Sequence, residues 1–216
     1  VGLVGSEMCI RDRYIEKDLL RRMQGHGRGG RMKIEKDHAE IFSGVRHAIT
    51  LGSPISLLIK NFDWVNWEDR MATGKPKKEH RKVTMPRPGH ADLAGVMKYG
   101  LDDIRNVLER SSARETAMRV AIGAVCRKLL EEVGITVGSR VYQIHNIVDE
   151  TPVSNNMSLK ELNDTVDASP VRCFDKAAEK KMMDVIDKAR NNGDSVGGSF
   201  EVIAKGLPYG LSLIHI

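Results

Sequence analysis

Hydrophobic residues recur at helical spacing in two long segments of the chain. From residue 112 the apolar positions include Ala117, Val120, Ala121, Ala124, Val125 and Leu129. Gly134 follows them, at a place where a left-handed residue commonly ends a helix. Residues 174–191 repeat the spacing with Ala178, Met182, Ile186 and Ala189. The pattern therefore predicts a long, largely buried helix starting at Ser112 and an amphipathic helix over residues 174–191.

Shorter apolar stretches have the alternation typical of strands. They cover residues 32–41, 55–59, 139–148 and 199–204. Residues 14–23 indicate the end of a further helix, which the glycine-rich loop at residues 25–31 terminates. No repeat of fixed period and no linker rich in Pro, Gly or Ser divides the chain. We therefore predict one domain, or part of one, of the α+β class.

The two ends of the chain differ from the segment between them. Residues 1–13 (VGLVGSEMCIRDR) show no sustained helical or strand period, and residues 212–216 (SLIHI) break off a turn-like segment. Both resemble translated sequencing-adapter sequence. We therefore expect residues 14–211 to be native and residues 1–13 and 212–216 to be non-native flanks. A genuine, poorly ordered terminus is the alternative.

Charge and composition narrow the class of function. The 216 residues carry a formal net charge of +5, with a pI near 9.1, which suits an anionic partner. Charge alone does not distinguish nucleic acid from a small phosphorylated metabolite. No apolar run approaches the roughly 18 residues of a membrane span. The three cysteines lack metal-ligand spacing, which favours a reducing, cytoplasmic location and no metal site.

Residues 87–119 gather a histidine, two serines and several arginines around the predicted helix start. Residues 112–115 match a capping box, in which the Ser112 oxygen accepts from the third helical N–H. Free N–H groups and the positive end of the helix dipole attract phosphate there. Arg110 and Arg114 add permanent charge and forked donors. This segment therefore predicts a site for phosphate or a phosphorylated ligand.

Three long motifs carry a family resemblance. They are GRGGRM at residues 27–32, RPGHAD at 87–92 and ERSSARET at 109–116, supported by SGVRH at 43–47 and GLPYGL at 206–211. In this order they make the chain similar to chorismate synthases, over essentially everything between the flanks. Family members are considerably longer. The resemblance therefore implies roughly the N-terminal half of an enzyme with a β-α-β sandwich core that assembles as a homotetramer.

The resemblance also implies a reaction and roles for single residues. Family members eliminate phosphate and a proton from 5-enolpyruvylshikimate 3-phosphate, giving chorismate for aromatic amino acid biosynthesis, and they need reduced FMN. Arginines that keep a fixed forked charge suit such a substrate. By family match, the substrate-binding residues would be Arg22, Arg28, Arg31, Arg87, Ser112 and Arg114. The FMN-binding residues would be Arg110, Ser111 and Ser112. Arg22 and Arg28 also match positions for NADPH, the implied reductant of the flavin, although they cannot easily serve both ligands at once.

His90 is the candidate for proton transfer. Imidazole titrates near physiological pH, and neighbouring groups can bias it either way. In the family this histidine lies beside the reduced flavin, which it would protonate or stabilise as an anion. The alternative is a hydrogen-bonded structural histidine in a turn made by Pro88 and Gly89.

Two parts of the family pattern are missing. The N-terminal Gly-Glu-Ser-His-Gly motif, whose histidine is thought to protonate the leaving phosphate, is replaced by VGLVGSEMCIRDR. The distal aspartate implicated in removing the C6 proton would lie beyond Ile216. Proton-transfer groups each contribute about 10²–10⁴-fold to a rate. We therefore expect the 216-residue chain to be inactive as it stands.

A basic nucleic-acid-binding protein is the alternative from another class. The loop at residues 25–31 could contact nucleic acid, and KPKKEHRK at residues 75–82 could follow a phosphate backbone. Strand-like segments separate the two stretches, and only 5% of the residues are aromatic and able to stack on bases. The sequence therefore favours a small phosphorylated substrate as the partner, with neither nucleic acid nor membrane.

Overall fold

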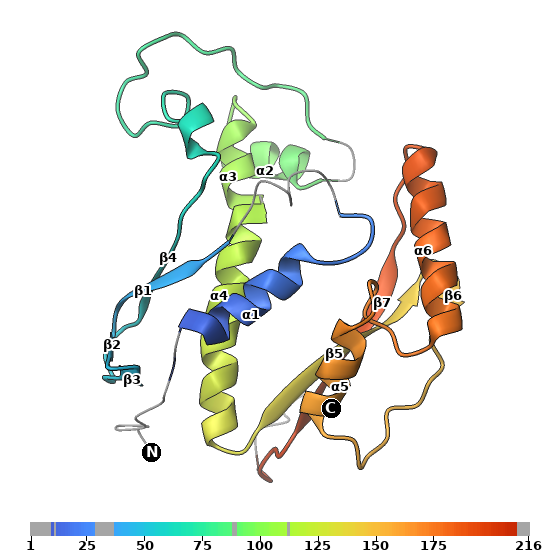
Figure 1. Ribbon diagram of the computed structural model, residues 1–216. Helices are drawn as coiled ribbons and strands as arrows, with labels where there is room; N and C mark the ends of the chain where they lie inside the picture. Colours follow the sequence, from blue (N-terminus) through green and yellow to red (C-terminus); the bar gives the residue numbers. More distant parts are fainter. Residues whose placement is uncertain (1–9, 11, 29–36, 88–89, 112, 211–216) are drawn as a thin grey trace.

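The computed structural model describes residues 10, 12–28, 37–87, 90–111 and 113–210 (Figure 1). For residues 109, 110, 113 and 114 it describes the backbone. The helices are α1 Asp12–Met23, α2 Asp92–Tyr99, α3 Arg105–Ser111, α4 Ala113–Glu132, α5 Leu159–Asp167 and α6 Lys176–Asn191, with a 3₁₀ turn at Trp64–Asn66. The strands are β1 Ala39–Ser43, β2 Val45–Arg46, β3 Ile49–Thr50, β4 Ser56–Ile59, β5 Thr136–Ile144, β6 Ile147–Val148 and β7 Gly198–Lys205.

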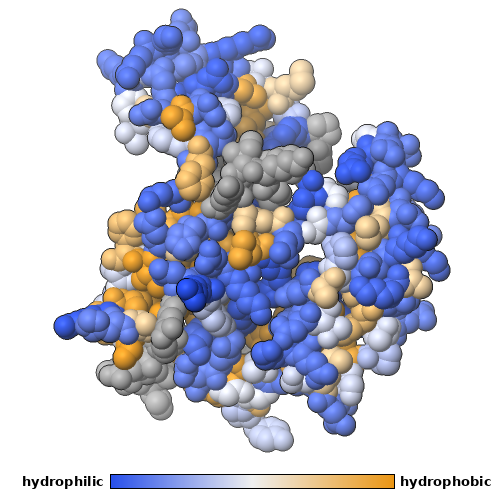
Figure 2. All heavy atoms as spheres, in the orientation of Figure 1, coloured by the Kyte–Doolittle hydropathy of each residue, from blue (hydrophilic) through white to orange (hydrophobic). Residues whose placement is uncertain are grey.

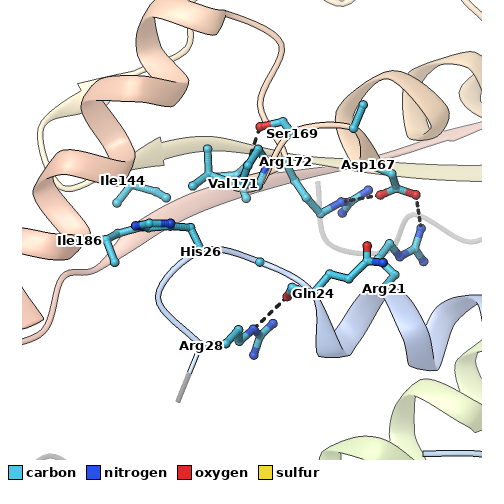
Figure 3. A pocket seen from close by; sticks show the side chains of 14 residues that line it. Arg21, Gln24, His26, Arg28, Ile144, Asp167, Ser169, Val171, Arg172 and Ile186 are labelled. Carbon is cyan, nitrogen blue, oxygen red and sulfur yellow. Dashed lines mark hydrogen bonds and ion pairs between the residues drawn. The ribbon is translucent and has the colours of Figure 1, made fainter. Parts of the chain in front are cut away.

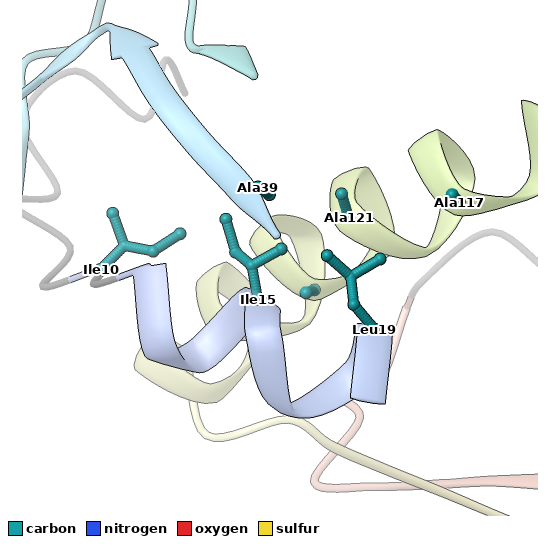
Figure 4. Packing of buried hydrophobic residues seen from close by; sticks show 7 residues of the cluster. Ile10, Ile15, Leu19, Ala39, Ala117 and Ala121 are labelled. Atoms are coloured by element: carbon teal, nitrogen blue, oxygen red, sulfur yellow. The ribbon is translucent and has the colours of Figure 1, made fainter. Parts of the chain in front are cut away.

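Helix α4 is the central column of the first half of the chain. Helix α1 crosses it, α3 continues from its upper end, and α2 lies beside α3 (Figure 1). The contact with α1 is made by small residues of α4, which let the two backbones approach. Ile15 and Leu19 of α1 pack against Ala117 and Ala121 (Figure 4). The predicted long helix is therefore confirmed, but it is not largely buried: the buried row is Ala117, Ala121 and Ala124, whereas Ile122 is 53% exposed.

Strand β5 organises the second half. It lies between β6 and β7, and both pairings are antiparallel. Helix α5 covers one face of this sheet, where Leu159 and Leu162 lie against Gly138. A Cβ at Gly138 would come within 3.3 Å of both leucines, so a larger residue there would require these side chains to shift by a few tenths of an ångström. Helix α6 buries Ala178 and Met182, as its periodicity predicts.

Several boundaries differ from those that the sequence predicts. The single strand expected over residues 139–148 is two strands, because the chain reverses at His145, whose φ is 54°, and β6 folds back on β5. Helices α2 and α3 have too few turns to show a clear period, and neither was predicted. Residues 32–36 of the first expected strand lie outside the described residues, but β1 and β4 do pair.

Part of the expected N-terminal flank packs into the described fold. Ile10 is 1% exposed and its N–H donates to the Ala48 carbonyl, and α1 begins at Asp12. The division into residues 1–13, 14–211 and 212–216 stays a prediction. None of the described helices is both long and apolar enough to cross a membrane.

Candidate functional site

The RPGHAD segment folds into a hydrogen-bonded cluster at the start of α2. The Asp92 side chain is fully buried, whereas those of Arg87 and His90 are 51% and 36% exposed. Arg87 donates to Asp92 through its backbone N–H at 3.0 Å, through Nε at 2.9 Å and through Nη2 at 2.9 Å. His90 Nδ1 lies 3.0 Å from Arg87 Nη2 and 3.1 Å from Asp92 Oδ1. A fixed cation and an imidazole are therefore accessible to solvent beside a buried carboxylate.

The electrostatics of this cluster favour full ionisation of the Arg87–Asp92 pair. The hydrogen bonds from the Arg87 side chain hold the pKa of Asp92 far below its usual range, against the effect of burial. The same contacts raise the pKa of Arg87. A carboxylate that keeps its charge at any moderate pH is a permanent acceptor for its neighbours.

The boundary between α3 and α4 holds the expected flavin-binding residues. Helix α4 begins at Ala113, one residue after the predicted start at Ser112, which lies outside the described residues. Helix α3 ends directly before it, with Arg110 and Ser111 in its last turn, and the Ser111 hydroxyl donates to the Val107 carbonyl at 2.7 Å. The expected anion site at this helix start stays a prediction. In the structure α3 ends at Ser111, directly before it.

The remaining arginines of the expected set lie in different surroundings. Arg22, at the end of α1, is 9% exposed and pairs with Asp37, Nη1 to Oδ2, at 2.9 Å. Arg28 is exposed, and its Nε donates to the Gln24 carbonyl at 3.2 Å. Arg31 lies outside the described residues, and Arg114 is in the first turn of α4, where the backbone alone is described. Arg22 would have to exchange Asp37 for a ligand anion, whereas Arg28 is accessible.

A cavity of about 470 Å³ opens beside Arg28, between the loop after α1 and the second half of the chain. His26, Ile144 and Ile186 lie at one end of it, and Arg21, Asp167 and Arg172 lie at the other (Figure 3). Asp167 accepts from Arg172 at 2.8 Å and pairs with Arg21 at 3.5 Å, so this carboxylate already balances part of the arginine charge. The motifs did not single out this cavity.

The described site residues thus form two groups. Arg22 and Arg28 lie at the end of α1 and in the loop after it, and Arg87 and His90 lie at the start of α2. Helices α1 and α3 both contact α4, and α2 contacts α3, so α4 is the common support for both groups (Figure 1). No group of metal-ligating side chains occurs within the described part of the chain.

Comparison with known proteins decides the family. The family model described as chorismate synthase matches residues 2–214. The chain belongs to the chorismate synthase family. A chorismate synthase of Geobacillus sp. (strain WCH70) is 54% identical over 216 residues, which are 98% of this chain and 55% of the relative. Chorismate synthase 2 of Bacillus thuringiensis (strain Al Hakam) is 50% identical over 218 residues, with the same shares.

A crystal structure of a chorismate synthase matches with a TM-score of 0.68 at 36% identity, covering 92% of this chain and 51% of that one. This likeness and the mixture of helices and small sheets confirm the predicted α+β class of the chorismate synthase type. The chain spans about half the length of the curated chorismate synthases it matches, as the motifs predicted.

The nucleic-acid alternative is not supported. The basic run at residues 75–82 lies on the hydrophilic upper part of the molecule (Figure 2) and is largely exposed, and two of its residues are tied to the segment before it. Asp69 accepts from the Lys77 N–H at 2.6 Å and pairs with His80 at 2.7 Å. The Trp67 ring, which could otherwise stack on a base, already faces the guanidinium groups of Arg70 and Arg105 at 5.8 Å.

Asp92 is a residue of the cluster that the sequence pattern did not single out. Its position two residues after His90 and within the RPGHAD motif was visible, but a carboxylate at a helix start is common on protein surfaces. Its importance depends on complete burial against the Arg87 guanidinium, which a linear pattern does not reveal.

Proposed function

We propose that the complete protein to which this chain belongs is a chorismate synthase. It eliminates phosphate and a proton from 5-enolpyruvylshikimate 3-phosphate to form chorismate in the shikimate pathway. The observation that carries the proposal is the Arg87–His90–Asp92 cluster, in which a half-exposed guanidinium and an exposed imidazole share a buried carboxylate. A fixed cation beside a titratable group is what release of an anionic leaving group with proton transfer requires.

Arg28 and Arg87 are the described arginines best placed to bind substrate anions, because each has an exposed guanidinium. A planar fork that stays charged suits a phosphate or a carboxylate. Arg31, Ser112 and Arg114 complete the proposed substrate set. Arg22 belongs to it on condition that the substrate displaces Asp37, so we expect it to act later than Arg28 as the ligand enters.

Reduced FMN is the proposed cofactor, with Arg110, Ser111 and Ser112 as its contacts and His90 beside it. The donor set described here fits an electron-rich, partly anionic ring, because Arg87 supplies positive charge and His90 can donate a proton to it. When bound, reduced flavin supplies the electron density that assists departure of the phosphate. His90 holds or moves a proton at its exposed ring nitrogen, and Arg87 and Asp92 keep that ring in place.

NADPH is proposed as the source of electrons for the flavin, through Arg22 and Arg28. The accessible Arg28 beside a cavity of about 470 Å³ supports a place for a further ligand. The pairing of Arg22 with Asp37 argues for one ligand at a time. We further propose that the complete enzyme is a cytoplasmic homotetramer.

The decisive experiment compares the complete coding sequence with the 216-residue chain. With reduced FMN and 5-enolpyruvylshikimate 3-phosphate, the complete protein is expected to release phosphate and chorismate, and the 216-residue chain is expected to release neither. His90→Asn in the complete protein should lower the rate about 10²–10⁴-fold. A complete protein without chorismate formation, or a fully active 216-residue chain, would contradict the proposal. Reading the coding DNA across residues 13 and 212 tests the proposed flanks.

A further inference from the structure

Asp92 is not among the residues assigned above to contact substrate or cofactor, yet its carboxylate is completely buried. Both oxygens are engaged by Arg87. Oδ2 accepts from the Arg87 backbone N–H at 3.0 Å and from Nε at 2.9 Å, and Oδ1 accepts from Nη2 at 2.9 Å. Burial of a charged carboxylate is tolerated only when its acceptor sites find donors. Asp92 therefore holds the Arg87 guanidinium in one orientation.

Three atoms of this cluster form a nearly equilateral triangle. Arg87 Nη2 lies 2.9 Å from Asp92 Oδ1 and 3.0 Å from His90 Nδ1, and His90 Nδ1 lies 3.1 Å from Asp92 Oδ1. Nδ1 of His90 thus faces a donor and an acceptor at similar distances. A neutral imidazole carries one N–H, and the partner of one ring nitrogen decides which nitrogen bears it.

We propose that Asp92 is a positioning residue that sets the tautomer of His90. By holding Arg87 Nη2 against His90 Nδ1, it makes Nδ1 an acceptor and keeps the ring proton on Nε2, across the ring from the cluster. When an anionic ligand draws Arg87 away, Asp92 Oδ1 is left as the partner of Nδ1. The proton then belongs on Nδ1, and Nε2 becomes an acceptor.

This inference rests on the proposed function, because it gives His90 a proton donor and a proton acceptor state. The position of Arg87 decides which ring nitrogen of His90 carries the proton. Arg87 is also a proposed ligand of the substrate anions. Capture of the substrate anion by Arg87 would thus be coupled to the hydrogen-bonding state of His90 Nε2. The helix position of Asp92 helps, since the first turn of α2 favours a negative charge.

The test reads the tautomer directly, in the 216-residue chain labelled with ¹⁵N-histidine. Long-range ¹H–¹⁵N spectra at about pH 8.5, above the ordinary imidazole pKa, distinguish Nε2–H from Nδ1–H. His90→Gln assigns the signal. The parent chain is expected to show Nε2–H. Arg87→Met, which removes the donor and leaves Asp92, is expected to show Nδ1–H. Adding Asp92→Ala to Arg87→Met should abolish the switch.

His80 is the matched control, because its Nε2 pairs with Asp69 at 2.7 Å in a separate loop. Its pattern is expected to stay constant in each variant, which shows that the fold persists. Asp92→Asn, which is nearly isosteric, is also added to Arg87→Met, beside Asp92→Ala. It should leave a weaker switch to Nδ1–H than the carboxylate does. The proposal is overturned if the parent chain shows Nδ1–H, or if Arg87→Met switches the tautomer equally without the carboxylate.

A kinetic test uses a complete family member with the same six residues, RPGHAD. Asp92→Asn should lower kcat about tenfold or more, and Asp92→Glu should recover part of the loss. If Asp92 served only in folding, Asp92→Asn and Asp92→Glu would lose activity equally, in proportion to the fraction of protein that is folded. Because the tautomer measurement needs no activity, a complete protein that makes no chorismate would refute the proposed function and leave this inference to be judged by the spectra.

Discussion

Single buried carboxylates connect separate segments of this chain through hydrogen bonds. Asp149 is fully buried after β6, and its Oδ2 accepts from the Phe174 N–H at 2.6 Å and from the Asp175 N–H at 3.3 Å, just before α6. Its Oδ1 accepts from the Thr151 N–H at 3.1 Å. Asp149 therefore ties the end of the β5–β6 hairpin to the start of α6, in the same way that Asp92 ties Arg87 to α2.

Asp149→Asn should lower the free energy of unfolding by about 2 kcal/mol, because hydrogen bonds to a charged group are lost and the new amide N–H₂ faces backbone donors. Urea unfolding followed by circular dichroism measures it. Asp164→Asn is the control, since that carboxylate is exposed and pairs with Lys160. The control should stay within about 0.5 kcal/mol of the parent. Equal losses in both variants would contradict this role of Asp149.

The same residue predicts a pH dependence. Burial raises the pKa of Asp149, but hydrogen bonds from Thr151, Phe174 and Asp175 outweigh it and hold the pKa below the usual value. A carboxyl group with a depressed pKa in the folded state contributes stability above its unfolded pKa of about 3.9. That contribution is lost as the pH falls through the folded value. The difference between the parent and Asp149→Asn should therefore shrink below about pH 4.

At the scale of elements, the approach of α2 to α3 depends on Gly95. A Cβ at this position would lie 2.4 Å from Val107 Cγ1, and Val107 is 3% exposed. Gly95→Ala should therefore destabilise the protein by about 1–3 kcal/mol through overpacking. It should also disturb the α2 start that carries His90 and Asp92.

Gly123→Ala is the matched control, because Gly123 lies in the middle of α4 with open space around the missing Cβ. This change should raise the free energy of unfolding by about 0.5–1 kcal/mol, since alanine loses less backbone entropy in a helix. Thermal and urea unfolding of the two variants give the comparison. The same sign for both changes would refute the assigned contact between α2 and α3.

Tyr14 connects α1 to α4 through hydrogen bonds. Its hydroxyl donates to Glu131 at 2.7 Å and accepts from Arg127 Nε at 3.1 Å. Burial, followed by the hydrogen bond to Glu131, raises the pKa of Tyr14 to about 12. A raised pKa in the folded state means that the neutral hydroxyl stabilises the fold below pH about 10, and that this contribution disappears as the pH rises towards 12.

Tyr14→Phe should therefore cost about 1 kcal/mol at neutral pH, and the cost should vanish in alkaline solution. Unfolding by urea at neutral pH and at alkaline pH measures both. Tyr209→Phe, at a fully exposed ring, is the control and should change stability at neither pH. A cost that persists unchanged in alkali would show that packing, and not the hydroxyl, is what Tyr14 contributes.

For the whole molecule, the open face of the β5–β7 sheet is the feature with the clearest consequence. Phe200 and Val202 of the edge strand β7 are 73% and 61% exposed. An apolar face on an unpaired edge strand favours association. The 216-residue chain should therefore self-associate as its concentration rises. Phe200→Thr combined with Val202→Lys should lower its mass in sedimentation equilibrium.

Met97→Lys is the control for that experiment, because Met97 is a 75% exposed apolar residue of α2, which lies beside α3 (Figure 1). It should leave the association unchanged. Equal masses for the parent and the double variant would show that β7 is not the contact.

Periodicity and motifs predicted much of the molecule. Helix α4, helix α6 and the strands β4 and β7 were visible because each spans enough residues to repeat a pattern. The family was visible because three long motifs occur in one order. The single strand expected over residues 139–148 was wrong, since a turn at His145 has no glycine or proline to mark it. The expected helix start at Ser112 took no account of α3, which is too short to show a period.

The amino-acid sequence by itself determined the class of the fold and the central helix, because these depend on neighbours along the chain. Its motifs, through the family resemblance, named the arginines and His90 as candidates. The tertiary structure alone decided that Asp92 is buried, that Arg22 pairs with Asp37 and that Arg28 borders a cavity. Burial and ion pairing depend on which surfaces meet, and those surfaces come from segments far apart in the sequence. For that reason the sequence identified Arg87 and His90 as candidates, but it did not identify the Asp92 carboxylate that lies against both of them.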